Sequence, residues 1–149
     1  MNSKQQEMIE QLNSKSIARQ LEAIDALRNV DDDEVLSGFI RVMMSTDELV
    51  WVDLEKGPHP KVEAYKAAVD IATSKKLLLS LVDRKSPEVR AGSAYLLGTV
   101  SNVEDSDRDG VVQSLRNALQ DPDPRVPYQA MRSLGRLGAL DIQEVLPFF

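Results

Sequence analysis

The chain has 149 residues, of which 42% are apolar and 28% charged, and this ordinary globular composition excludes a disordered chain. No apolar run reaches the ~18 residues that a membrane-spanning helix needs, and the polar first ten residues do not resemble a signal peptide, so we expect a soluble, cytoplasmic protein. The absence of cysteine excludes disulfides, thiol nucleophiles and thiolate metal sites, and a single histidine excludes a histidine cluster within one chain.

The net charge of −6 is unevenly distributed along the chain. Residues 1–60 hold 12 acidic and 6 basic side chains, whereas residues 61–149 hold 12 of each. Nucleic acid and anionic membrane surfaces attract an excess of Lys and Arg, so this balance argues against both as partners. The densest acidic block, residues 31–34, is expected to start a helix that Asp32 or Asp33 caps, and the alternative is a ligand site.

Apolar residues recur at helical spacing along almost the whole chain, which predicts an all-α fold. The apolar stripes begin, in chain order, at Ile17, Leu36, Val111 and Val126. Stretches rich in Pro, Gly, Asp and Ser separate the stripes. The sequence therefore predicts four pairs of helices, at about 3–30, 33–73, 74–102 and 107–138, with residues 139–149 starting a further helix or a cap.

Two predicted helix starts are near copies of each other. Residues 86–89 (Ser-Pro-Glu-Val) and 123–126 (Asp-Pro-Arg-Val) each place a proline at the first helical position, directly after a side chain that can cap the helix. Residues 59–62 give a looser version of the same start. A period of roughly 30 residues made of paired helices is typical of a stacked α-solenoid.

Small residues inside the second helix of each pair favour close packing between neighbouring pairs. They let two backbones approach, at a cost in helix propensity that only tertiary packing would justify. No pair buries its apolar face alone, so each pair is expected to close the core of the next. The small residues are Ala67, Ala68, Ala91, Gly92, Ala94, Gly98, Ala130 and Gly135.

Residues 119–126 (Leu-Gln-Asp-Pro-Asp-Pro-Arg-Val) and the related residues 81–90 resemble HEAT-like repeats, of the short subtype found in phycobilisome bilin lyases and in many scaffold proteins. The resemblance is specific over residues 75–138, moderate over 59–73 and poor over 1–57. It implies a right-handed α-solenoid of about four helical hairpins, whose second helices form a concave surface used for protein binding. It implies no reaction.

The same resemblance gives one repeat domain over residues 1–149, with an insert loop at 46–58. In this family an arginine often follows the valine of the second helix and supports stacking from within the repeat. Arg90 matches that pattern, whereas Glu63 and Pro127 occupy the equivalent positions in the other two repeats and interrupt an arginine ladder.

Two tyrosines and two arginines on the second helices form a candidate partner-binding surface. Arg132 and Arg136 lie opposite the apolar stripe of the last second helix, and Tyr95 and Tyr65 lie on comparable faces of earlier ones. An aromatic and guanidinium surface suits an acidic protein partner. The alternative is an ordinary solvated helix face on which arginine stems cover alanines.

The insert loop at 46–58 carries Trp51, the only tryptophan of the chain. A long connection in a repeat array lies on one face, and a large aromatic residue in such a loop is a candidate binding residue. The alternative, and the commoner fate of a single tryptophan, is that Trp51 packs back over the core.

Residues 105–110 resemble the first half of a calcium loop, with Asp105, Asp107 and Asp109 at positions 1, 3 and 5 and Gly110 at position 6. The closing carboxylate is missing, because Arg116 occupies position 12. We therefore expect a solvated acidic loop, and no metal or other cofactor.

No catalytic group is identifiable in the sequence. His59 lies between two prolines in a turn without an evident acid or base partner, and serine-nucleophile and phosphate-loop motifs are absent. We therefore expect a non-enzymatic scaffold that binds a protein partner through its concave face or insert loop. The alternative is a chromophore chaperone or enzyme similar to a bilin lyase, and a third possibility, a HEAT-like DNA-repair glycosylase, conflicts with the net charge of −6.

The last residues, 146–149 (Leu-Pro-Phe-Phe), are apolar where a repeat array normally ends in a polar cap. Either these side chains fold back onto the last repeat, or the end is an interface between copies of the chain, or the natural protein continues beyond it.

Overall fold

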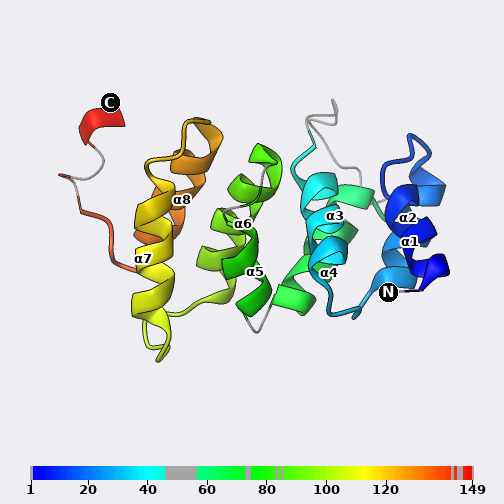
Figure 1. The fold of residues 1–149 in the computed structure, drawn as a ribbon, viewed down its shortest axis with the longest axis horizontal. Coiled ribbons are helices and arrows are strands. Elements are labelled where there is room, and N and C mark those ends of the chain that lie inside the picture. Colours follow the sequence, from blue (N-terminus) through cyan, green and yellow to red (C-terminus); the bar gives the residue numbers. More distant parts are fainter. Residues whose placement is uncertain are drawn as a thin grey trace. The chain divides into compact units, whose positions relative to one another are not determined.

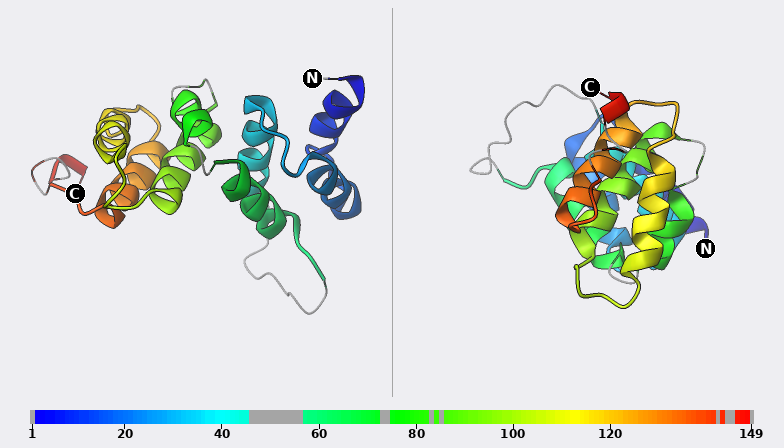
Figure 2. Two further views of the ribbon diagram at one scale, coloured as in Figure 1. Left: turned by 90° about the horizontal axis from the view of Figure 1, so that it is seen from below. Right: turned by 90° about the vertical axis from the view of Figure 1, so that its left-hand side faces the viewer.

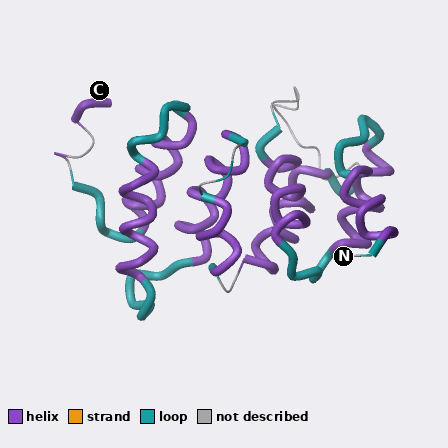
Figure 3. Tube along the Cα trace, viewed as in Figure 1, coloured by secondary structure: helices purple, strands orange, loops and turns teal. Residues whose placement is uncertain are grey.

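The computed structural model describes residues 2–45, 57–72, 75–82, 84, 86–141, 143 and 146–148. Within these residues the chain forms eight α-helices and one short 3-10 helix, and no strand (Figures 1 and 3). The helices pack in pairs, which confirms the predicted all-α array of helical hairpins. None of the described helices is long and apolar enough to cross a bilayer.

The contacts group the chain into two compact units, residues 1–73 and 74–149. In the first unit α1 packs against α2, and α3 packs against α4. The second helices α2 and α4 also contact each other, and so do the first helices α1 and α3. The bounds are α1 (Ser3–Gln11), α2 (Ile17–Leu27), α3 (Asp33–Met43) and α4 (Pro60–Ala72).

The second unit repeats this arrangement with α5 against α6 and α7 against α8, and Figure 2 shows the pairs from two further directions. Its most extensive contact joins the second helices, α6 and α8. The predicted pairs agree with the observed helices to within a few residues. The bounds are α5 (Lys76–Leu81), α6 (Pro87–Val100), α7 (Arg108–Ala118), α8 (Arg125–Arg136) and the 3-10 helix η2 (Leu146–Phe148).

Side chains cap the helices where the sequence places Asp and Ser. Asp32 caps α3 by accepting a hydrogen bond from the backbone N–H of Glu34 at 2.8 Å, and Ser86 caps α6 by accepting one from Val89 at 3.4 Å. Asp123 binds the N–H of Arg125 at 3.0 Å, although α8 begins one residue later than the proline pattern predicts. These bonds satisfy N–H groups that the first helical turn leaves without partners.

The apolar stripes supply most of the buried core. Leu36, Phe39 and Ile40 of α3 are fully buried, as are Val126 and Ala130 of α8. The stripe predicted for α2 is wrong at its first residue, because 51% of Ile17 is exposed. Ile17 is the first residue of α2 and lines a groove at this end of the hairpin.

Candidate functional site

The second helices of the second unit approach each other at Gly98 of α6. A Cβ at this position would lie 2.7 Å from Cα of Ser133 on α8, closer than real contacts allow. The hydroxyl of Ser133 donates a hydrogen bond to the carbonyl of Ala94 at 2.5 Å across the same contact. Gly98 therefore confirms the predicted close packing of second helices, whereas Gly135 does not, because its Cβ would meet only Leu140, at 4.0 Å.

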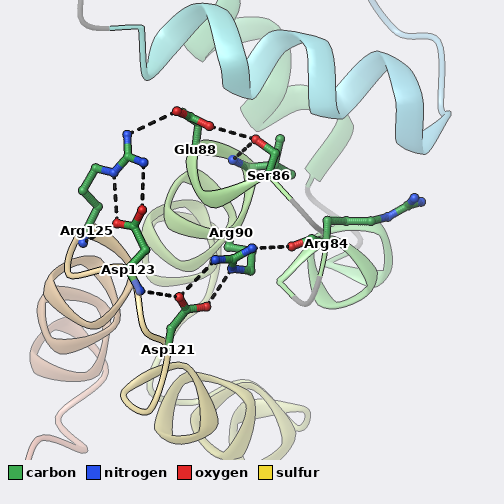
Figure 4. Close-up of polar contacts among 8 residues, drawn as sticks. Arg84, Ser86, Glu88, Arg90, Asp121, Asp123 and Arg125 are labelled. Carbon is green, nitrogen blue, oxygen red and sulfur yellow. Dashed lines mark hydrogen bonds and ion pairs between the residues drawn. The ribbon is translucent and has the colours of Figure 1, made fainter.

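A chain of polar side chains joins the first turn of α6 to that of α8 (Figure 4). The hydroxyl of Ser86 donates to Glu88 at 2.9 Å, and Glu88 lies 3.3 Å from the guanidinium of Arg125. Arg125 also binds Asp123 at 2.8 Å. The positive charge of Arg125 is thus shared between two carboxylates.

These contacts shift the ionisation of both carboxyls. The side-chain hydrogen bond from Arg125, followed by the bond from the backbone N–H of Arg125, lowers the pKa of Asp123 to about 2. The pKa of Glu88 is also lowered, by its own backbone N–H and then by the hydroxyl of Ser86, with a smaller contribution from Arg125. Both groups are therefore carboxylates at neutral pH.

Hydrogen bonds of Arg90 connect the start of α6 to the turn before α8 (Figure 4). Its guanidinium binds Asp121 through two hydrogen bonds of 2.7 and 3.1 Å, and it donates a third to the carbonyl of Arg84 at 2.8 Å. The side chains of Arg90 and Asp121 are only 15% and 12% exposed. The arginine that matches the family pattern thus joins one repeat to the next, 31 residues further along the chain.

Tyr95 of α6 lies close to two arginines of α8. The guanidinium carbon of Arg132 lies 5.8 Å from the ring centre of Tyr95, and that of Arg136 lies 5.6 Å from the same ring. Arg136 also donates to the hydroxyl of Thr99 at 3.2 Å, and Arg132 lies 5.9 Å from the ring of Tyr128. We call Tyr95, Tyr128, Arg132 and Arg136 the Tyr–Arg face.

The charge of the Tyr–Arg face differs from that of its surroundings. Arg90 and Arg125 each bind a carboxylate. Arg132 and Arg136 are exposed and form no ion pair with any described residue. Their guanidiniums contact only uncharged groups among those described, namely two tyrosine rings and one hydroxyl, and no carboxylate neutralises their charge there. The face therefore presents two positive charges, one helical turn apart, that remain available to an anion.

The structure brings together three of the five residues that the sequence analysis selected. Tyr95, Arg132 and Arg136 meet as described, whereas Tyr65 lies half-buried on α4 in the first unit. Trp51 and residues 46–56 of the predicted insert lie outside the described residues. Tyr128, 55% exposed, was not selected, although its spacing of four residues from Arg132 on one helix face would have identified it.

The acidic loop that resembles half a calcium site is occupied by a side chain. The ammonium of Lys75 binds Asp105 at 2.5 Å and Asp107 at 2.8 Å, and the backbone N–H of Asn102 donates to Asp105 at 2.9 Å. Burial alone would lower the pKa of Lys75, but its hydrogen bonds to the two carboxylates outweigh burial and raise it. Among the described residues, no group of three or more acidic or histidine side chains is placed to hold a metal.

The predicted interface at the C-terminal end concerns residues that are only partly described. Leu140 and Leu146 are 47% and 52% exposed. The side chain of Phe148 and all of Phe149 lie outside the described residues. The oligomer interface therefore stays a prediction.

A comparison with known protein families matches part of the chain. Residues 74–149 match the sequence profile of a family described as HEAT repeats. This region coincides with the second unit, which holds the Tyr–Arg face. No curated protein matches the chain significantly.

Proposed function

This chain belongs to the HEAT-repeat family, and on that premise we propose that it is a non-enzymatic scaffold that binds an acidic protein partner through the Tyr–Arg face. HEAT-repeat domains are generally protein-interaction scaffolds. Fold alone does not define a function, so the proposal depends on the site. The observation that carries it is the pair of exposed guanidiniums, Arg132 and Arg136, held on tyrosine rings without a carboxylate partner among the described residues.

The composition of the face supports contact with protein. Tyrosine and arginine are enriched at protein interfaces and among the residues that contribute most to binding. The rings of Tyr95 and Tyr128 restrict the arginine side chains before a partner arrives, so less conformational entropy is lost on binding. A guanidinium can also donate two parallel hydrogen bonds to one carboxylate.

The spacing of the arginines describes the partner more closely. Arg132 and Arg136 are four residues apart on α8, about 6 Å along the helix axis. Two carboxylates one turn apart on a partner helix would reach both guanidiniums at once. We therefore expect an acidic helix rather than a single acidic residue.

Capture of partners by charge-reversed protein tests this proposal. We expect full-length protein to retain acidic proteins from a lysate of its source cells, and Arg132→Glu with Arg136→Glu to lose them by at least tenfold in quantitative mass spectrometry. The control, Lys4→Glu with Arg19→Glu, makes the same charge change on exposed residues of the first unit. An unchanged set of partners in the Arg132 and Arg136 variant would refute the proposal.

Trp51 is the second partner contact that we propose, on the evidence of the sequence alone. Trp51→Ala in the same experiment separates the two surfaces. Partners lost only from this variant would assign binding to the insert loop instead of the Tyr–Arg face.

The alternative function is a chaperone for an open-chain tetrapyrrole, suggested by the resemblance of the short repeats to those of bilin lyases. Two guanidiniums beside tyrosine rings are groups that could pair with propionates and stack on a pyrrole ring. Absorbance spectra of the protein with a bilin decide between the functions. A red-shifted, saturable spectrum that disappears with Arg132→Glu would favour the chaperone.

A further inference from the structure

A groove of about 570 Å³ lies in the first unit, where α1 and α3 end and α2 and α4 begin. Its walls come from the turn after α1, the first turn of α2, the last turn of α3 and the residues that start α4. Pockets that bind small molecules measure about 300–1,000 Å³, so the groove is of suitable size.

The charge of this groove is opposite to that of its unit. Residues 1–73 contain 14 acidic and eight basic side chains. The described residues that line the groove nevertheless include Lys15, Arg41 and Lys61, and none of them is Asp or Glu. Three of the eight basic residues of the unit thus line one groove, an arrangement that suits an anion.

The start of α4 adds hydrogen-bond donors to these charges. The backbone N–H of Lys61 donates to Nδ1 of His59 at 3.1 Å, so the hydrogen of the neutral imidazole is on Nε2. This Nε2 is buried and has no hydrogen-bond partner among the described residues. The ammonium of Lys61 is fixed at the groove wall by a 2.6 Å hydrogen bond to the carbonyl of Ser45.

Apolar walls complete the site. The helices α2 and α4 begin at the groove while α1 and α3 end there, so the positive and negative ends of the helix dipoles oppose each other and the side chains supply the positive charge. Leu12, Val42 and the exposed Ile17 supply apolar walls beside the charges. The exposure of Ile17, which the apolar pattern of α2 does not explain, is thus accounted for by the groove.

From these observations we propose that the groove binds a small molecule that carries a phosphate group and a compact apolar part. A phosphate has three terminal oxygens and a charge between about −1.5 and −2 when esterified at neutral pH. It can therefore meet donors from several directions, here Lys15 from the turn after α1, Arg41 from α3, and Lys61 with His59 from α4. A carboxylate has only two oxygens and a single charge, so it would satisfy fewer of these donors.

Addition of a phosphate ligand, followed through the NMR signals of the single histidine, tests the site directly. Because His59 is the only histidine, the imidazole C–H signals in a ¹H NMR spectrum belong to the groove. We expect phenyl phosphate to shift these signals in a saturable way, with a dissociation constant at least tenfold lower than that of benzoate, which has the same ring and a carboxylate. Signals that do not move, a shift that rises linearly, or equal binding of benzoate would overturn the proposal.

Matched variants separate a built site from general attraction of anions. Lys15→Gln with Arg41→Gln removes two exposed charges of the groove and should raise the dissociation constant at least tenfold. Lys4→Gln with Arg19→Gln removes two exposed charges outside it and should raise the constant less than threefold. Circular dichroism establishes that both variants are folded. Equal weakening by the two pairs would also overturn the proposal.

Discussion

Both units consist of helical hairpins with similar apolar stripes, but different residues join neighbouring hairpins in the two units. In the second unit the tight approach lies between second helices, where Gly98 faces the backbone of Ser133. In the first unit it lies between α3 and the end of α1, where a Cβ at Gly38 would lie 2.7 Å from a methyl group of Leu12. The position equivalent to Gly98 in α4 is Ile71.

The ion pairs that join the hairpins differ in the same way. Arg90 of α6 reaches forward to Asp121 in the next hairpin, whereas Glu63, at the equivalent position of α4, binds Arg28 of the preceding hairpin at 3.1 Å. The family profile matches only the second unit. The comparison teaches that apolar spacing is enough to form the hairpins, whereas the sequence signature of the family includes residues that join one hairpin to the next.

The largest expected loss of stability follows a substitution at the contact between α6 and α8. Gly98→Val should lower the free energy of unfolding by about 3 kcal/mol, measured by urea denaturation, because its side chain would overlap the backbone of Ser133. The control is Gly135→Ala, whose Cβ would make only an ordinary contact with Leu140 at 4.0 Å, and this substitution should raise stability by about 0.5 kcal/mol. Equal effects at both glycines would contradict the tight approach of the second helices at Gly98.

The next largest expected loss of stability follows removal of the ion pairs that join the hairpins. Arg90→Met should cost about 2 kcal/mol, because it leaves the carboxylate of Asp121 mostly buried without its cation. Arg28→Met in the first unit should cost about 1 kcal/mol, because that pair is more exposed, at 29% and 21%. A larger loss from Arg28→Met than from Arg90→Met would reverse the comparison.

The buried lysine gives a smaller, pH-dependent effect within the second unit. Lys75→Gln should lower stability by about 1 kcal/mol at pH 7, whereas the neighbouring, exposed Lys76→Gln should leave it unchanged. The hydrogen bond from Lys75, followed by that from Asn102, lowers the pKa of Asp105 below its ordinary 3.8.

The sign of that pH dependence follows from linkage. The interaction of Asp105 with Lys75 stabilises the fold fully above the ordinary pKa of 3.8 and is lost as the pH falls through the lowered value. The stability difference between wild type and Lys75→Gln should therefore narrow in acid. A difference that stays constant from pH 7 to pH 2 would contradict the assignment.

The smallest effect is on the Tyr–Arg face. Tyr95→Leu should cost about 0.5 kcal/mol, because it removes two partly solvated cation–π contacts while retaining the apolar packing. Tyr128→Leu, at a more exposed ring with one such contact, should cost less. If both substitutions were neutral in stability yet weakened partner binding, the face would serve recognition and contribute nothing to joining α6 and α8.

Much of the local structure was predictable because it depends on neighbouring residues. The caps at Asp32 and Ser86, the prolines at helix starts and the buried stripes all follow from spacing within a few residues. The meeting of Tyr95 with Arg132 and Arg136 was also predictable, because a repeat period places equivalent helix faces together.

The partners of Lys75, Arg90 and Glu63 were not predictable, because each lies about 30 residues or more away in the chain. The groove at His59 was not predictable from the sequence either, because Lys15, Arg41 and Lys61 come from three separate segments. The sequence by itself determined the helices, their pairing and the membership of the family. Only the tertiary structure decided which charges neutralise each other and which remain exposed, because those distances depend on how one hairpin packs against the next.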